Sequence, residues 1–248
     1  TVATGNNYAL SWIADCVGDV TLTLVYNNSS SEFFPEESTK DLVISVDKKK
    51  LTVYDIDFEP PASLTFDGNE HPAGLTAKVN GAGELTVTYY DSDGEPLESA
   101  PVNAGSYTVK VSAAEGEFYK AASGLTDSGW EFAIAKAAAP RKNESMAKFS
   151  YAATGEKSVP AAGLPENMGA VGEVSLTFTG DDIGKDVIVA DSMRYSDGRV
   201  YFTLAEGNTM NRYGYINMTV PSQNYEDISF RICILISSKE DIEAPASG

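Results

Sequence analysis

The amino-acid sequence predicts an all-β protein that consists of tandem antiparallel β-sandwich modules. Three observations carry this prediction: apolar and polar residues alternate in short runs, turn-forming residues separate the runs, and one strand pattern recurs along the 248 residues. Alternation with a period of two indicates a strand with one buried face. A long amphipathic helix pattern is missing from the sequence.

The alternating runs are clearest at residues 20–24, 107–111 and 216–220. The pairs Asp93-Gly94 and Asp197-Gly198 suit tight hairpin turns, because glycine tolerates a positive φ. The alanine-rich residues 132–139 end at a proline and follow a β-like Trp-Glu-Phe run. We therefore expect a strand there that continues into a linker, rather than a helix.

The recurring pattern is a glycine, an alternating strand, a loop with an aromatic residue and a second alternating strand. Its three copies start at Gly18, Gly105 and Gly214. The apolar residues share one phase after each glycine: Val20, Leu22 and Leu24; Tyr107, Val109 and Val111; Ile216, Met218 and Val220. A slip of one residue would turn these side chains to solvent, so the shared phase predicts a shared structural unit. A unit of about 85–110 residues with short antiparallel strands fits an immunoglobulin-like sandwich.

The repeat predicts the domain boundaries. Residues 1–50 correspond to the closing strands of an incomplete module, and residues 51–137 form a module of their own. Residues 138–240 form a related module, and residues 241–248 are a linker tail. Three strands alone bury little surface, so how the first segment is completed stays open.

Composition excludes several classes of function. The chain has 36 acidic and 18 basic residues, a net charge of −18, a single histidine and two cysteines. Nucleic-acid binding needs clustered Lys and Arg, a structural zinc site needs several His or Cys ligands, and a disulfide framework needs more cysteines. No run approaches the 18 apolar residues of a membrane span. Because the negative charge is spread along the chain, we expect self-repulsion and a monomer.

Three stretches carry a resemblance to a known family: LTFDGNEH at 64–71, LTVTYYDSDG at 85–94 and APVNAGSYTV at 100–109. With them, residues 64–136 resemble the MBG-type bacterial immunoglobulin-like modules, which occur in tandem on surface proteins of Gram-positive bacteria. Residues 1–50 are similar to the last half of such a module, and residues 144–238 look like a related sandwich module. The resemblance implies a secreted or cell-surface protein of a Gram-positive bacterium that acts as a stalk or adhesion segment, without catalytic, cofactor or metal residues.

Two residue patterns invite a catalytic interpretation. His71 lies in the turn-rich stretch 67–72 without a nucleophile at a suitable spacing, so we expect a solvated loop histidine. Ser145 and Lys148 spell the Ser-x-x-Lys motif of penicillin-binding enzymes, which requires a helix start. Their surroundings are extended, so we interpret the motif as a chance match and expect no enzyme.

Acidic turns leave one binding alternative open. The stretch from Asp91 to Glu95 and the pair Asp181-Asp182 offer oxygen atoms to calcium, but the twelve-residue calcium loop is absent. Turn chemistry is the preferred interpretation, and a weak calcium site is kept as a hypothesis. Cys16 and Cys233 fall in different modules, so we expect two free thiols rather than a disulfide bond within one module.

Aromatic residues divide by strand phase. Tyr107, Trp130 and Phe132 point into a core, and Tyr215 points away from one. Two further tyrosines, at 195 and 201, flank the Asp-Gly turn and form either an exposed ligand platform or a pair that stabilises the hairpin.

The sequence favours a non-catalytic extracellular stalk or adhesion segment that spaces its modules through short junctions at 46–50 and 137–140. The alternative is a carbohydrate-binding accessory module of a larger secreted hydrolase. A protein or glycan ligand stays unidentified, and no ligand-binding residue is assigned. A Lys–Asn isopeptide crosslink would require a buried Lys, Asn and acid together.

Overall fold

The computed structural model describes residues 17–26, 38–140 and 143–238, and these residues form almost only β-strands. The one helical element among them is the short 3-10 turn η1 (Val53–Asp55). This confirms the predicted all-β class. Contacts divide the chain into two compact units that interleave along the sequence. Unit 1 comprises Thr1–Pro60, Ala73–Tyr90 and Thr108–Glu131, and unit 2 comprises Pro61–Pro72, Asp91–Tyr107 and Phe132–Gly248.

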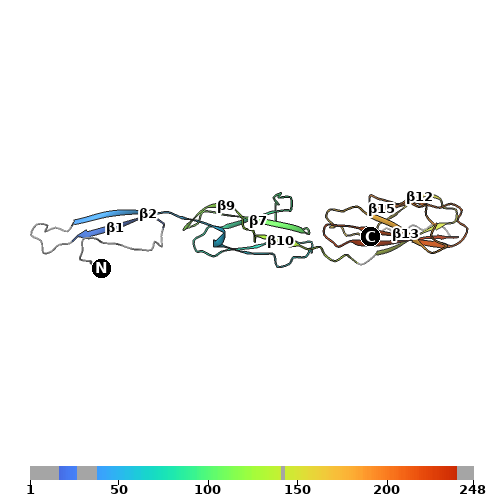
Figure 1. Cartoon of the computed structure of the whole chain (residues 1–248), viewed down its shortest axis with the longest axis horizontal. Coiled ribbons are helices and arrows are strands. Elements are labelled where there is room, and N and C mark those ends of the chain that lie inside the picture. The colour runs from blue at the N-terminus through green and yellow to red at the C-terminus, as the bar shows by residue number, and fades with distance from the viewer. Residues whose placement is uncertain (1–16, 27–37, 141–142, 239–248) are drawn as a thin grey trace, which may run out of the picture. The chain divides into compact units, whose positions relative to one another are not determined.

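Unit 1 contains an antiparallel hairpin of β1 (Gly18–Tyr26) and β2 (Ser38–Val46), drawn in blue in Figure 1. Its register pairs Leu22 with Leu42 and Val20 with Ile44, so these apolar residues of the two strands share one face. The remaining strands of unit 1 are β3 (Lys49–Lys50), β4 (Ile56–Glu59), β5 (Gly74–Ala77), β6 (Leu85–Tyr90), most of β7 (Gly105–Ala113), β8 (Tyr119–Lys120) and β9 (Ala122–Leu125).

Together with β10 (Glu131–Ile134), these strands form three sheets. β4 pairs with β5, β3 pairs with β8, and a four-stranded sheet has the order β10-β7-β6, with β9 also paired to β7. β10 (Glu131–Ile134) is the strand predicted within 132–139. Its residues alternate between exposed and buried, and the chain then continues as an extended segment.

Unit 2 contains two further sheets. The first has the order β11-β17-β16-β13, formed by β11 (Asn143–Ser150), β17 (Ile228–Ser237), β16 (Arg212–Val220) and β13 (Ser175–Gly180). The second has the order β12-β15-β14, formed by β12 (Gly155–Pro160), β15 (Arg199–Leu204) and β14 (Arg194–Ser196). Apolar side chains of both sheets form one buried cluster, which includes Phe149, Phe202, Ile216 and Ile232. Two sheets that share one core make a β-sandwich.

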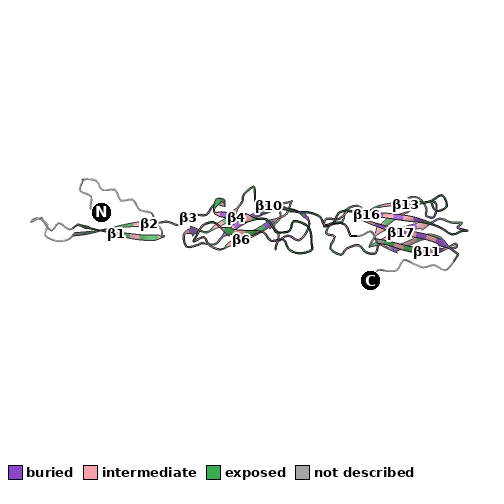
Figure 2. Cartoon of the chain, turned by 90° about the horizontal axis from the view of Figure 1, so that it is seen from below, coloured by how far each residue is buried: buried purple, intermediate pink, exposed green. Residues whose placement is uncertain are grey.

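Strand phase decides which side chains enter this core. Buried and half-buried residues alternate along β16 from Gly214 to Val220 and along β17 from Ile228 to Ile236, as Figure 2 shows in purple and pink. The register places Ile216 opposite Ile232 and Met218 opposite Phe230, and all four side chains are buried. The hairpin of β1 and β2 differs, because Leu24 and Leu42 are each 50% exposed.

The two strands of each predicted copy are neighbours: β1 with β2, β7 with β10, and β16 with β17. The repeat itself stays a prediction. Most strands pair antiparallel, as expected, but some strands pair in parallel. β11 runs parallel to β17, and β3 runs parallel to β8. The module boundaries at 50, 137 and 240 remain a prediction.

Candidate functional site

His71 is buried, so the prediction of a solvated loop histidine is wrong. Its side chain is 3% exposed, and Nδ1 donates to the carbonyl oxygen of Ser63 at 2.9 Å. The His71 backbone N–H donates to the Pro101 carbonyl oxygen at 2.9 Å, which draws the turn-rich segment inward. Nε2 is buried without a hydrogen-bond partner, and the nearest carboxylate oxygen, on Asp67, lies 3.4 Å away.

The carboxylate of Asp67 is already used by its own loop. The backbone N–H of Asn69 donates to it at 2.9 Å and is the main reason that the pKa of Asp67 lies below its usual value. The histidine therefore contacts a carbonyl and faces a turn-capping acid, and this arrangement supplies no hydroxyl or thiol nucleophile.

Ser145 and Lys148 both lie in strand β11. Residues three apart in a strand point to opposite faces, so their side chains cannot act together. In the parallel register Ser145 pairs with Ile232, and Lys148 pairs with Leu235. This agrees with the interpretation of Ser-x-x-Lys as a chance match.

The acidic turns use their carboxylates as backbone caps. Asp91 Oδ1 accepts from the backbone N–H of Asp93 at 3.0 Å and of Glu95 at 2.9 Å. Asp181 Oδ1 accepts from the N–H of Ile183 at 3.1 Å and of Gly184 at 2.7 Å. These contacts support the turn interpretation. Within the described part of the chain, no three or more His, Cys, Asp and Glu residues are grouped to hold a metal ion.

Cys233 is a free, half-buried thiol on β17, between the buried Ile232 and Ile234. Burial raises its pKa, an effect that nearby Arg231 opposes. Its predicted counterpart, Cys16, lies outside the described residues.

The aromatic residues assigned to a core are buried: Tyr107, Trp130 and Phe132. Tyr215 lies on the opposite face of β16 from the core, beneath the guanidinium of Arg231 at 4.3 Å from the ring centroid. Both results confirm the strand phase.

The two tyrosines beside the Asp197-Gly198 turn do not form a common platform. In the β14–β15 register Tyr195 is opposite the buried Val200, and Tyr201 is opposite Arg194. Residues directly opposite each other share a face, so the two rings lie on different faces. The Arg194 guanidinium also covers the Tyr201 ring at 3.8 Å from its centroid. The platform alternative is therefore wrong, and a stabilising role in the hairpin remains.

Two places in the described part of the chain follow the second strand of a predicted copy and join segments distant in sequence by both backbone and side-chain contacts. The first, the Lys49 joint, consists of residues 48–50 and 115–120. The backbone N–H of Lys49 donates to the Phe118 carbonyl oxygen at 2.8 Å, and Lys49 pairs in parallel with Tyr119. Lys48 Nζ lies 2.5 Å from Glu115 Oε1 and donates to the Gly116 carbonyl oxygen at 2.8 Å.

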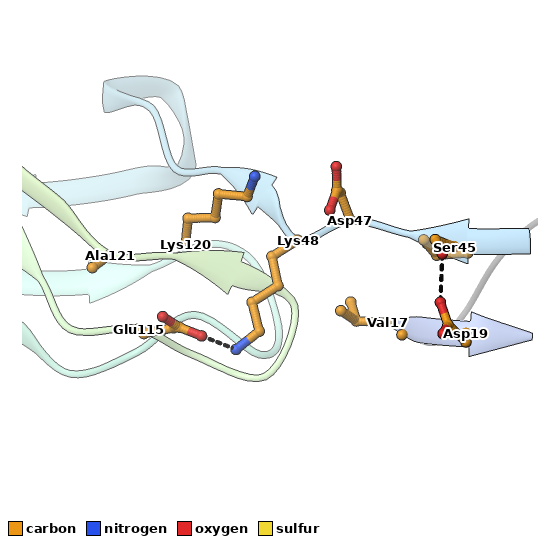
Figure 3. Close-up of a pocket in the computed structure, with 10 residues that line it drawn as sticks. Val17, Asp19, Ser45, Asp47, Lys48, Glu115, Lys120 and Ala121 are labelled. Atoms are coloured by element: carbon orange, nitrogen blue, oxygen red, sulfur yellow. Dashed lines mark hydrogen bonds and ion pairs between the residues drawn. The ribbon is translucent and has the colours of Figure 1, made fainter.

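A shallow cavity of about 660 Å³ adjoins the Lys49 joint. Figure 3 shows Lys48 reaching Glu115 on one side and the Ser45 hydroxyl donating to Asp19 on the other. Charged residues of both signs line it, including Asp47 and Lys120. The Lys48 ammonium bonds to Glu115 and holds the pKa of that carboxyl below its usual value. Mixed charges at an open surface provide no defined ligand chemistry.

The second place, the Ala137 joint, lies in unit 2 and consists of residues 135–137, 103–104, 167–170 and 222–226. The Ala137 N–H donates to the Asn224 carbonyl oxygen at 2.9 Å, and the Glu226 N–H donates to the Ala137 carbonyl oxygen at 2.9 Å. Ala137 thereby pairs in parallel with Tyr225. Two residues earlier, Ala135 pairs with Thr65, so the extended segment after β10 is held on both sides.

The side chain of Asn224 is the centre of the Ala137 joint. It is 1% exposed, and its Oδ1 accepts from the Ala104 N–H at 2.9 Å. Its Nδ2 donates to Asn103 Oδ1 and to the Asn167 carbonyl oxygen, both at 2.9 Å. A buried amide with every donor satisfied fixes one arrangement, because any displacement leaves an unpaired polar group.

Packing around Asn224 reinforces this arrangement. Phe66 meets Tyr225 edge to face with centroids 5.4 Å apart, and the Tyr225 hydroxyl donates to Asn167 Oδ1 at 3.0 Å. Gly169 has a φ of +68°, and a Cβ atom there would lie 2.7 Å from Gln223 Oε1 and 3.1 Å from Asn224 Nδ2. The buried polar side chains in the described residues include Asn224 but no lysine, so the isopeptide alternative has no support there.

Sequence reasoning identified the loop that contains Asn224 only as the aromatic loop of the third repeat. It did not assign a role to Asn103, Asn167 or Asn224. Asn103, Asn167 and Asn224 lie in three separate loops of the sequence, so no local pattern indicated that they meet.

Comparisons with known proteins give one specific result. Residues 61–137 match the family model of the MBG domain. No curated protein matches the chain. No helix in the described part of the chain is long and apolar enough to cross a membrane.

The chain also shows low similarity to solved structures. Extracellular domains 3–5 of Drosophila OTK are 9% identical, with a TM-score of 0.30 over 75% of this chain and 67% of that chain. The endo-fucoidan hydrolase MfFcnA4 of glycoside hydrolase family 107 is 11% identical, with a TM-score of 0.26 over 90% of this chain and 34% of that chain. TM-scores this low support no conclusion about the fold or the function of this chain. The family match, in contrast, confirms the predicted resemblance: residues 61–137 are similar to the MBG domain.

Proposed function

We propose that this chain is a non-catalytic segment of an extracellular surface protein, in which β-sandwich modules act as a stalk that spaces or presents a binding surface. The MBG-type module and the all-β architecture support an extracellular module. A cell surface of a Gram-positive bacterium is the proposed location, on the strength of the sequence resemblance.

The Ala137 joint is the observation that carries this proposal. A spacer transmits position only when the segments between its modules cannot swing freely. Here the segment after β10 is paired at Ala135 and again at Ala137, and the buried Asn224 amide holds the surrounding loops. A Gly/Ser linker would have none of these bonds.

The other two functional classes have less support. A carbohydrate-binding accessory role depended on Tyr195 and Tyr201, which lie on different faces of their hairpin. An enzyme depended on His71 or on Ser145 with Lys148, and neither set of contacts contains a nucleophile activated by a base. The adhesive part of the proposal has no assigned ligand-binding residue.

Residual dipolar couplings of the uniformly ¹⁵N-labelled chain test the proposal. We expect amides in residues 61–72 and 91–107 to fit the same alignment tensor as amides in residues 143–238. In the Asn224→Ala variant the two sets should require separate tensors. Separate tensors in the unmodified chain would refute the stalk, and turnover of a glycan or peptide by the purified chain would refute its non-catalytic character.

A further inference from the structure

The Lys49 joint and the Ala137 joint have the same backbone geometry. In each, one N–H donates to the carbonyl oxygen of the residue before a tyrosine: Lys49 to Phe118 at 2.8 Å, and Ala137 to Asn224 at 2.9 Å. In each, the donor residue pairs in parallel with that tyrosine, Tyr119 or Tyr225.

The two joints also occupy the same place in the repeat. β2 ends at Val46 and β10 ends at Ile134, so each donor is the third residue after the second strand of a copy. The acceptor lies in the loop between the two strands of the next copy, after β7 in one case and after β16 in the other. Two joints with equal spacing, direction and hydrogen bonding indicate one recurring device.

We propose that the aromatic loops of the second and third copies are docking sites for an extended strand, and that the partner each loop fits is the segment that follows the preceding copy. The mode is β-augmentation, in which main-chain hydrogen bonds hold an extended peptide at an exposed edge. The partner needs a free N–H three residues after its last strand, which excludes proline there. This inference rests on the proposed stalk function, because it explains how successive modules are joined.

The side chains differ between the two docking sites. They make the Lys49 joint sensitive to salt and the Ala137 joint insensitive to it. At the Lys49 joint, the docked segment is held by an ion pair whose Glu115 side chain is 62% exposed, so salt screens it. At the Ala137 joint, Lys136 takes the place of Lys48 after its strand but forms no ion pair with a described residue. Neutral amide bonds of the buried Asn224 replace it, and screening does not weaken them.

The charges around the Lys49 joint support a response to salt. Glu115 faces Lys48 and Lys120, and Asp19 and Asp47 line the same cavity. All of these groups are close enough to the surface for counterions to reach them, because the cavity is shallow. The Ala137 joint has no such group among the contacts of Asn224.

Amide hydrogen exchange on the full chain tests the proposal. The Lys49 and Ala137 amides are compared with the Val109 amide, which donates from β7 to the carbonyl oxygen of Trp130, the residue before β10. Raising sodium chloride from about 0.1 M to about 1 M shortens the Debye length from about 10 Å to about 3 Å. Protection of Lys49 relative to Val109 should fall about two- to fivefold, the range of exposed ion pairs. The Ala137 ratio should stay unchanged.

Two variants complete the test. Glu115→Gln should lower the Lys49 ratio at low salt and abolish its response to added salt, and the matched control Glu117→Gln should behave like the unmodified chain. An unprotected Lys49 or Ala137 amide, or a Lys49 ratio indifferent to both salt and Glu115→Gln, would overturn the proposal. These readouts are local, so they can fail while the shared alignment tensor, and with it the stalk, stands.

Discussion

The Lys49 joint and the Ala137 joint use one backbone arrangement but opposite side-chain chemistry. An exposed ion pair between Lys48 and Glu115 supports the first, and a nearly fully buried amide, Asn224, supports the second. Exposed ion pairs contribute little to stability and weaken with salt. Burying an amide side chain costs free energy unless all of its hydrogen bonds form, so the Asn224 side chain holds a single geometry. The difference shows how one docking device gives either a weak or a strong connection.

The largest expected effect comes from removing the buried amide. Asn224→Ala leaves the Ala104 N–H without its acceptor and should lower the free energy of unfolding by about 2–3 kcal/mol. Urea unfolding followed by tryptophan fluorescence and circular dichroism measures this. Asn217→Ala is the matched control, because that amide makes one exposed bond to Thr179. Equal losses in the two variants would show that the buried hydrogen bonds of Asn224 contribute no more than one exposed bond.

A smaller effect is expected from crowding the same amide. Gly169→Ala should destabilise the chain by about 2 kcal/mol, because a Cβ atom would meet Gln223 and Asn224 at a positive φ. Gly207→Ala has a similar φ of +75° but open space, so it should cost about 1 kcal/mol. The difference between their unfolding midpoints isolates the contact with Asn224, and no difference would contradict it.

Removing one hydroxyl from the Ala137 joint should have a smaller effect again. Tyr225→Phe keeps the edge-to-face contact with Phe66 but loses the bond to Asn167. We expect a loss of about 0.5–1 kcal/mol. A double-mutant cycle with Asn167→Ala should show that the two losses are not additive, and additive losses would show that the bond contributes nothing.

The smallest expected effect is at the Lys49 joint and depends on pH. Lys48 lowers the pKa of Glu115 in the folded chain, so the ion pair is fully present above the ordinary pKa of a glutamate. Its contribution is lost as the pH falls through the lower, folded value. Lys49 amide protection relative to Val109 should therefore decrease below about pH 4.3, while the Ala137 ratio stays level. A parallel decrease at Ala137 would indicate general acid unfolding instead.

Local sequence patterns were sufficient to predict those features of the structure that depend on residues close together in the sequence. The Asp197-Gly198 pair forms the predicted tight turn, with φ values of 52° and 72°. The alternation along 216–220 correctly placed Ile216 and Met218 in the core. In both cases backbone geometry within a few residues decides the outcome.

Sequence patterns failed where a distant partner decides the environment. His71 looked solvated because its neighbours form turns, but a bond to Pro101 places it inside. The turn between Tyr195 and Tyr201 was recognised, yet the β14–β15 register puts their rings on opposite faces. A shift of one residue in register would have reversed that outcome, and periodicity alone does not fix register in a short hairpin.

The sequence by itself determined the all-β class, the strand phases of β16 and β17 and the resemblance of residues 61–137 to the MBG domain, because these follow from local periodicity and recognisable motifs. Only the tertiary structure decided how the copies are joined. Ala104 and Asn224 are 120 residues apart, and nothing in either neighbourhood specifies the other. Their hydrogen bond forms because folding buries both polar groups at one place, where each satisfies the other.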